Sequence, residues 1–219
     1  LEFRRVLFRS GTGLALFGYQ AGYSTTGSNV TAFGPSAARS TTTGGAITAI
    51  GEQALYSNTT ASYNTAVGYQ AVYSGNGADI TAVGYQAGYS NTGDNNTYYG
   101  FRAGRSTTSG TEIIAVGRDA LYANTTGSYN TAIGSESLRS NTTASNNTAV
   151  GYQAAYTNTT GGYVTALGAK AGYTFNGTDS VFIGSFAGYS ASSGSNTFVG
   201  ASSGDYTTGV GNTGVGDRK

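Results

Sequence analysis

The octapeptide Asn-Thr-Ala-Val-Gly-Tyr-Gln-Ala, which spans Asn147–Ala154, returns intact or lightly edited about a dozen times along the 219-residue chain. Such a fixed period is typical of a stacked repeat architecture, in which each repeat buries its apolar face only against its neighbours. Positions are numbered here from the glycine of the motif, which is position 0. This glycine recurs every 16 or 17 residues, at Gly18, Gly34, Gly51, Gly68, Gly84, Gly100, Gly117, Gly134, Gly151, Gly168, Gly184, Gly200 and Gly216.

The residues before each glycine predict a short β-strand. Position −1 is always apolar, position −2 is mostly Ala, and position −3 is Thr in ten of the thirteen repeats. β-Branched residues favour strands, and a glycine in every repeat would break a helix. Because strand side chains alternate between faces, positions −3 and −1 share one face. We expect the apolar −1 ladder to form the dry core, with a threonine ladder buried beside it and hydrogen-bonded along the stack.

The residues after each glycine predict a turn, a second short strand and a polar loop. Position +3 is Ala or Ser, which suits a narrow interior, and position +5 is Tyr in eight of twelve repeats. The sequence therefore predicts an all-β fold: a parallel β-solenoid (β-roll) of about 12 coils with a 16–17-residue repeat. Residues 11–219 form this single repeat domain.

Position +4 varies with repeat length. It is Gly in five of the six 16-residue intervals, whereas three of the 17-residue intervals carry Leu55, Leu121 and Leu138. We expect the larger side chain to pack beneath the longer loop, whose extra residue makes room for it.

Residues 1–10 do not fit the repeat. They hold three of the 11 basic residues, and their Leu-Glu and Glu-Phe dipeptides are what two common cloning-site hexamers encode. We interpret them as a linker or adapter-derived, non-repeat segment. The alternative is a basic segment that caps the first coil.

Composition excludes several classes of function. The chain has no Cys and no His, which removes disulfides, thiolate chemistry, the usual zinc sites and the usual general base. A formal charge of +1 gives no electrostatic case for nucleic acid or an anionic membrane. No apolar run approaches the roughly 20 residues that cross a bilayer. We therefore expect no enzyme, no cofactor and no membrane contact in this segment.

The carboxylates do not suggest a catalytic or metal site. Glu52, Glu112, Asp119 and Glu136 lie in different repeats, and we interpret them as surface decoration. Calcium at loop acids such as Asp79, Asp94 and Asp179 is a weaker alternative, because a calcium ion takes six to eight oxygen ligands and each loop offers one carboxylate. We expect no metal.

The repeat resembles a known family. Asn64–Ala71 and Asn147–Ala154 are similar to the Asn-Ser-x-Ala-Ile-Gly-x-x-Ser/Ala repeat of trimeric autotransporter adhesin heads, and to repeats of phage and bacterial tail fibres. The resemblance covers nearly all of residues 13–216. It implies a left-handed parallel β-roll, a homotrimer of parallel chains, and an extracellular location on a cell surface or virion fibre. Two features depart from it: the period is longer, and Thr replaces the frequent apolar residue at −3.

The expected function is that of a structural or adhesive segment of an extracellular fibre, acting as a rigid spacer and surface-binding platform. A host-surface or glycan receptor would contact the tyrosine ladder at +5, or else this ladder packs the roll or a trimer interface. Its members are Tyr23, Tyr56, Tyr73, Tyr89, Tyr122, Tyr156, Tyr173 and Tyr189.

The alternative function is ice binding. It requires the threonine ladder to face solvent as a regular row of hydroxyl and methyl groups. The members of this ladder include Thr31, Thr48, Thr65, Thr81, Thr131, Thr148 and Thr165.

Overall fold

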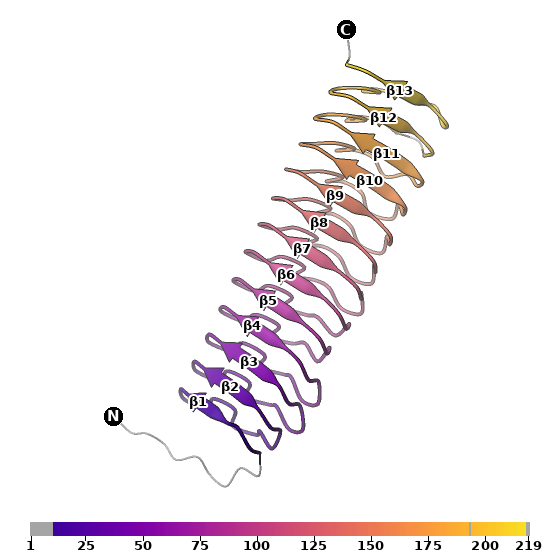
Figure 1. Cartoon of the computed structure of the whole chain (residues 1–219). Coiled ribbons are helices and arrows are strands. Elements are labelled where there is room, and N and C mark those ends of the chain that lie inside the picture. The colour runs from indigo at the N-terminus through magenta and orange to yellow at the C-terminus, as the bar shows by residue number, and fades with distance from the viewer. Residues whose placement is uncertain (1–10, 193, 218–219) are drawn as a thin grey trace.

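The computed structural model describes residues 11–192 and 194–217, which form a straight stack of coils with one strand in each coil (Figure 1). The adapter interpretation of residues 1–10 lies outside the described residues. The strands are β1 (Ala15–Phe17), β2 (Val30–Phe33), β3 (Ile47–Ile50), β4 (Thr65–Val67), β5 (Thr81–Val83), β6 (Thr97–Tyr99), β7 (Ile114–Val116), β8 (Thr131–Ile133), β9 (Thr148–Val150), β10 (Val164–Leu167), β11 (Ser180–Ile183), β12 (Thr197–Val199) and β13 (Thr213–Val215).

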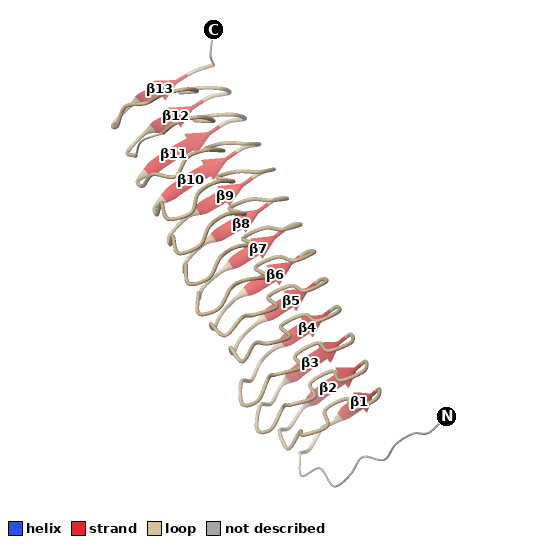
Figure 2. Cartoon of the chain, turned by 180° about the vertical axis from the view of Figure 1, so that it is seen from behind, coloured by secondary structure: helices blue, strands red, loops and turns tan. Residues whose placement is uncertain are grey.

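These strands form one parallel sheet in sequential order, β1 to β13. The register places equal motif positions opposite each other, as in the pairing of Thr148 with Thr165 and of Ala149 with Ala166. The predicted all-β parallel solenoid is confirmed. Figure 2 shows that the strands occupy one side of the rod and that loops and turns close each coil on the other.

The predicted second strand of each coil is wrong. Positions +1 to +6 form turns instead. These turns still hydrogen-bond from coil to coil, because the amide of Gly22 donates to the carbonyl of Ala37 at 2.7 Å and the amide of Ser24 donates to that of Arg39 at 2.9 Å. The stacked turns therefore satisfy their backbone groups as a sheet does, without strand geometry.

The motif glycine is the point where successive coils approach most closely. Gly151 has φ = 136°, and its amide donates to the carbonyl of Ile133 in the preceding coil at 2.8 Å. A Cβ added to Gly151 would lie 2.5 Å from the carbonyl oxygen of Gly168 in the following coil. Glycine is thus required here both for its backbone conformation and for the absence of a side chain.

The interior is built from small side chains, and the predicted dry core at −1 is wrong. Ala149 at −2 and Ala154 at +3 are fully buried, as are their counterparts in the central coils. Val150 at −1 points outward and is 36% exposed. Two facing segments of one thin coil leave room for alanine methyl groups but not for a continuous Val/Ile ladder, so the smaller residue of the strand points inward.

Larger interior side chains pack mainly at positions +4, −2 and −4, and those at −4 include the buried Ile47, Ile80 and Ile113. Leu55, Leu121 and Leu138 at +4 are fully buried, as the expected packing beneath the loop requires. Where −2 carries an aromatic ring, the adjacent +4 residue is glycine: a Cβ on Gly188 would lie 2.3 Å from the ring of Phe182. The ring therefore occupies the space that a leucine fills elsewhere, which adds a second reason for glycine at +4.

An asparagine occupies position −4 in six of the thirteen coils and links neighbouring coils where it occurs. The buried amide group of Asn64 donates from Nδ2 to the carbonyl of Gly77 at 2.8 Å and accepts from the amide of Ile80 at 2.9 Å. Asn96 makes the same two bonds to Gly110 and Ile113. A buried side-chain amide that pairs both its groups stabilises the fold, whereas an unpaired one would destabilise it. The first residue of the motif is thus a clamp between coils; in Asn147 the clamp is a single bond, accepted from the amide of Val164 at 2.9 Å, and Nδ2 has no partner among the described residues.

Replacing Gly151 by Ala tests the close approach. We expect the free energy of unfolding to fall by about 1–3 kcal/mol for the positive φ and by a similar amount for the clash with Gly168. Gly216→Ala is the matched control, because its φ is 117° but an added Cβ meets no atom within 4 Å. Thermal and urea unfolding would check this, and equal, small losses for the two variants would contradict the account.

Candidate functional surfaces

The outer face of the sheet carries two unpartnered ladders. Position −1 contributes exposed apolar side chains along the stack, including Ile50 (41% exposed) and Ile133 (39% exposed). Position −3 contributes threonines on the same face, partly or fully exposed, whose hydroxyls make no hydrogen bond to the described residues. The shared face is confirmed, but the burial predicted for the threonine ladder is wrong. Its hydroxyl groups are free to meet solvent or a ligand.

The candidate tyrosine ladder at +5 forms two runs of stacked rings on the turn that follows the strand. Tyr73 stacks between Tyr56 and Tyr89, with ring centroids 5.0 and 5.1 Å apart. Tyr173 stacks in the same way between Tyr156 and Tyr189, at 5.1 and 5.0 Å. Burial, followed by the neighbouring tyrosines, raises the pKa of Tyr173 above its usual value.

Arginine side chains bridge the breaks in this ladder. The guanidinium of Arg39 lies 5.6 Å from the ring centroid of Tyr23 and 5.4 Å from that of Tyr56. Arg139 lies between Tyr122 and Tyr156, at 5.3 and 5.8 Å. Rings and guanidinium groups in this arrangement attract each other through dispersion and cation–π interactions.

The stacking favours a packing role for the ladder. A sugar ring binds an aromatic residue through the face of its π-system, and in Tyr73 and Tyr173 both faces are covered by other rings. Tyr23, at the first turn, is 58% exposed. The role of the ladder as a receptor surface stays a prediction.

A second ladder lies at position +2. Its earlier coils carry hydrogen-bonded glutamines, and its later coils carry charged side chains. Gln86 donates to Gln70, and Gln70 donates to Gln53, each at 2.8 Å. Further along, Arg102 binds Asp119 with two bonds of 2.9 and 3.0 Å. Ladders of this kind satisfy polar side chains along the whole stack.

Asp119 is the exception to the predicted surface decoration by carboxylates. Its side chain is only 2% exposed, and it accepts hydrogen bonds from Arg102 and Arg118. Arg118 also contacts Glu136, which in turn accepts a bond of 2.7 Å from Gln153. The interpretation of Asp119 as surface decoration is wrong. Arg102 occupies the same +2 position one coil earlier, and its guanidinium pairs with the buried carboxylate. The result is an ion-pair chain that spans three coils and is extended to a fourth by the hydrogen bond from Gln153.

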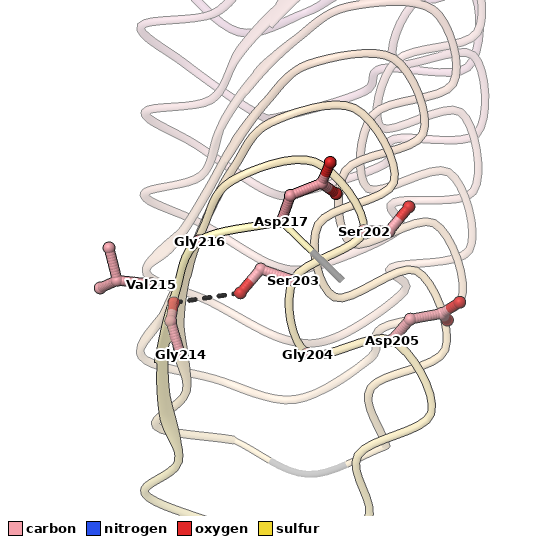
Figure 3. A pocket seen from close by; sticks show the side chains of 8 residues that line it. All are labelled: Ser202, Ser203, Gly204, Asp205, Gly214, Val215, Gly216 and Asp217. Atoms are coloured by element: carbon pink, nitrogen blue, oxygen red, sulfur yellow. Dashed lines mark hydrogen bonds between the residues drawn. The ribbon is translucent and has the colours of Figure 1, made fainter. Parts of the chain in front are cut away.

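The described residues offer no deep site for a small ligand or a metal. No three of their His, Cys, Asp and Glu side chains gather where they could hold a metal ion. A hollow of about 220 Å³ lies at the uncovered end of the last coil, where Ser203 donates to the carbonyl of Gly214 at 3.1 Å. Its lining side chains are drawn in Figure 3. The lining comes from positions +2 to +5 of the turn and from β13 with the two residues that follow it, so the hollow is an open end of the stack.

Comparison with known proteins identified no relative of the chain. No family model, no curated protein and no solved structure matches the chain. The described part of the chain contains no candidate for a membrane-spanning helix.

Replacing Tyr73 by Ala tests the role of the ladder. The loss of two stacks predicts a fall of about 1–3 kcal/mol in the free energy of unfolding. Tyr163→Ala is the control, because this ring is 65% exposed and its removal should change stability by less than about 0.5 kcal/mol. If urea unfolding of the two variants is the same, the ladder does not stabilise the roll.

Acid titration tests the ion-pair chain. The bond from Gln153, with further contributions from Arg118, lowers the pKa of Glu136 below its usual value. Glu136 therefore stabilises the fold above its unfolded pKa, and this contribution is lost as the pH falls through its lower folded pKa. We expect Glu136→Gln to lower the urea midpoint at pH 7 and to have a smaller effect near pH 3. The exposed Glu52→Gln serves as the control, and a Glu136→Gln effect independent of pH would contradict this assignment.

Proposed function

We propose that this chain is a rigid segment of an extracellular fibre and that copies of it assemble side by side through the outer face of the sheet. The observation that carries the proposal is the apolar −1 ladder, which runs from Phe17 on β1 to Val215 on β13 without a covering layer. Contiguous exposed apolar surface on a folded chain marks an interaction site.

The thin interior supports assembly through this face. Most of the buried core is alanine, and residues such as Leu55 and Phe182 are exceptions. A coil of this composition removes little apolar surface from water, whereas covering Ile50, Ile133 and their neighbours would remove more. Self-association thus supplies burial that the single roll lacks.

The resemblance to adhesin heads and tail fibres supports the remaining parts of the proposal. It makes the assembly a homotrimer of parallel chains, located on a cell surface or virion. The stiffness of a continuous 13-stranded stack suits a spacer and presentation platform. Such a role requires no catalytic site. A host-surface or glycan receptor would then meet the loops and the exposed edges of the roll.

Ice binding is the second candidate, and the outward threonine ladder favours it. Thr48, Thr65 and their counterparts present free hydroxyl and methyl groups at the regular spacing of the coils, about 4.7–4.9 Å. Ice and a partner chain would compete for the same face, so the oligomeric state separates the two candidates.

Sedimentation velocity on the purified chain tests the proposed assembly. We expect a species of about 66 kDa, which is three copies of the 22.1 kDa chain. Ile133→Glu/Val150→Glu should give a folded monomer, because it places two charges on the apolar face. Thr126→Glu/Thr143→Glu adds the same charges to exposed loops and should leave the trimer intact.

The opposite results would redirect the proposal. A monomer at all concentrations would refute assembly. A monomer that also shows thermal hysteresis, abolished by Ile133→Glu/Val150→Glu, would establish ice binding instead.

A further inference from the structure

The chain contains two Asn-Gly dipeptides, Asn76-Gly77 and Asn176-Gly177, and both occupy the same place in the stack. Each asparagine stands at position +8 of a 16-residue coil that directly follows a 17-residue coil. A 17-residue coil is followed by a 16-residue coil only at these two points. The two dipeptides therefore mark the places where the repeat becomes one residue shorter.

The side-chain carbonyl of each asparagine takes the place of a backbone carbonyl. Between successive 17-residue coils, the threonine at +8 donates from its amide and its hydroxyl to the backbone carbonyl at +8 of the next coil, as Thr42 does to Thr59 at 2.8 and 3.1 Å. Thr59 in turn donates from both groups to Oδ1 of Asn76, at 2.8 and 3.2 Å. Asparagine thus completes the bonding between coils where the loop loses a residue.

Successive backbone amides converge on Oδ1 of Asn76. Besides the two groups of Thr59, the amides of Thr60 and Ala61 donate to this oxygen at 3.3 and 3.5 Å. Successive amides that point at one site form a concavity that favours negative charge. The surroundings of Oδ1 therefore suit an oxygen that becomes an anion.

The second site repeats the first. Oδ1 of Asn176 accepts from the amide of Thr159 at 2.7 Å, from its hydroxyl at 3.0 Å, and from the amide of Thr160 at 3.1 Å. Two sites that lie six coils apart thus share one arrangement, because both arise from the same change in repeat length.

The groups that would react at each site are accessible. Both asparagine side chains are exposed, and their Nδ2 groups donate to no described residue. The amides of Gly77 and Gly177 likewise donate to no described residue. Glycine has no Cβ to shield its own amide nitrogen, so this nitrogen is open to act as a nucleophile toward the preceding side chain.

We propose that Asn76 and Asn176 are sites of spontaneous covalent modification, at which the folded chain converts a side-chain amide to a carboxylate. The amide nitrogen of the following glycine gives its proton to hydroxide and bonds to Cγ. The bond from Cγ to Nδ2 breaks, and Nδ2 leaves as ammonia with a proton from water. One water molecule then opens the five-membered imide, so each event consumes one water, releases one ammonia and adds one negative charge.

The donors promote the step in which charge develops on Oδ1. Attack by the glycine nitrogen turns this carbonyl oxygen into an oxyanion, and the amide and hydroxyl of Thr59 already donate to it in Asn76. Donors held in place before a reaction stabilise an oxyanion without reorganisation. An unfolded chain lacks them, so the folded chain reacts faster. Neither asparagine belongs to a strand of the outer face, so the reaction does not require the assembly of copies.

The rate of conversion at each site tests the proposal. The intact chain is incubated at mildly alkaline pH, folded in buffer and unfolded in urea, with circular dichroism to confirm each state. Peptide mapping by mass spectrometry then follows the mass change at each asparagine. We expect first-order conversion of Asn76 and Asn176 that is several-fold faster in the folded chain. Conversion at an equal or slower rate in the folded chain would overturn the proposal, because the fold would then give no assistance.

Removing one donor hydroxyl tests the mechanism site by site. Thr59→Val keeps the backbone amide but removes the hydroxyl that donates to Asn76, and we expect conversion at Asn76 alone to slow by about fivefold. Thr159→Val should slow conversion at Asn176 alone. Each site is therefore the internal control for the other.

Thr108→Val is the matched control variant. Its hydroxyl donates to the backbone carbonyl of Thr125 at 3.0 Å and touches neither asparagine, so both rates should stay unchanged. Unchanged rates at the targeted asparagines in Thr59→Val and Thr159→Val, with both variants folded by circular dichroism, would show that the donors do not promote the reaction and would overturn the proposal.

Discussion

The close approach of backbone to backbone at the motif glycine governs the structure. Each of the twelve glycines from Gly34 to Gly216 donates to the −1 carbonyl of the preceding coil at 2.7–2.8 Å, with no space for a side chain along most of the stack. This contact sets equal residues of successive coils directly above one another. Tyrosine then stacks on tyrosine, glutamine bonds to glutamine, and asparagine clamps the next backbone, so each ladder follows from one repeated constraint.

The sequence predicted the parallel solenoid because the period places glycine, alanine and β-branched residues at fixed intervals. It did not predict which strand face is buried. Alternation shows that Thr148 and Val150 share a face, but only the width of the coil reveals that Ala149 points inward. The buried Asp119 was predictable in principle, because Arg102, Asp119 and Glu136 all occupy position +2 of successive coils. The turns at +1 to +6 were not, because they use backbone conformations with positive φ, as at Val72, that composition does not signal.

The ladders divide between those that hold the roll together and those that remain available. The tyrosine and arginine stack at +5 and the asparagine clamps at −4 are occupied by contacts within the chain. The outer face, with its free threonine hydroxyls and apolar −1 ladder, has no partner within the described residues. Both proposed functions, assembly and ice binding, therefore use the outer face and not a cleft.

Amide hydrogen exchange of the motif glycines, measured by NMR, tests the central constraint most directly. The account predicts strong protection of the amides of Gly84, Gly100, Gly117 and Gly134 at the middle of the stack, with protection falling toward both ends as the terminal coils open. Exchange of these four amides at the rates of an unstructured peptide would contradict it, because the coils would then not be joined at their glycines.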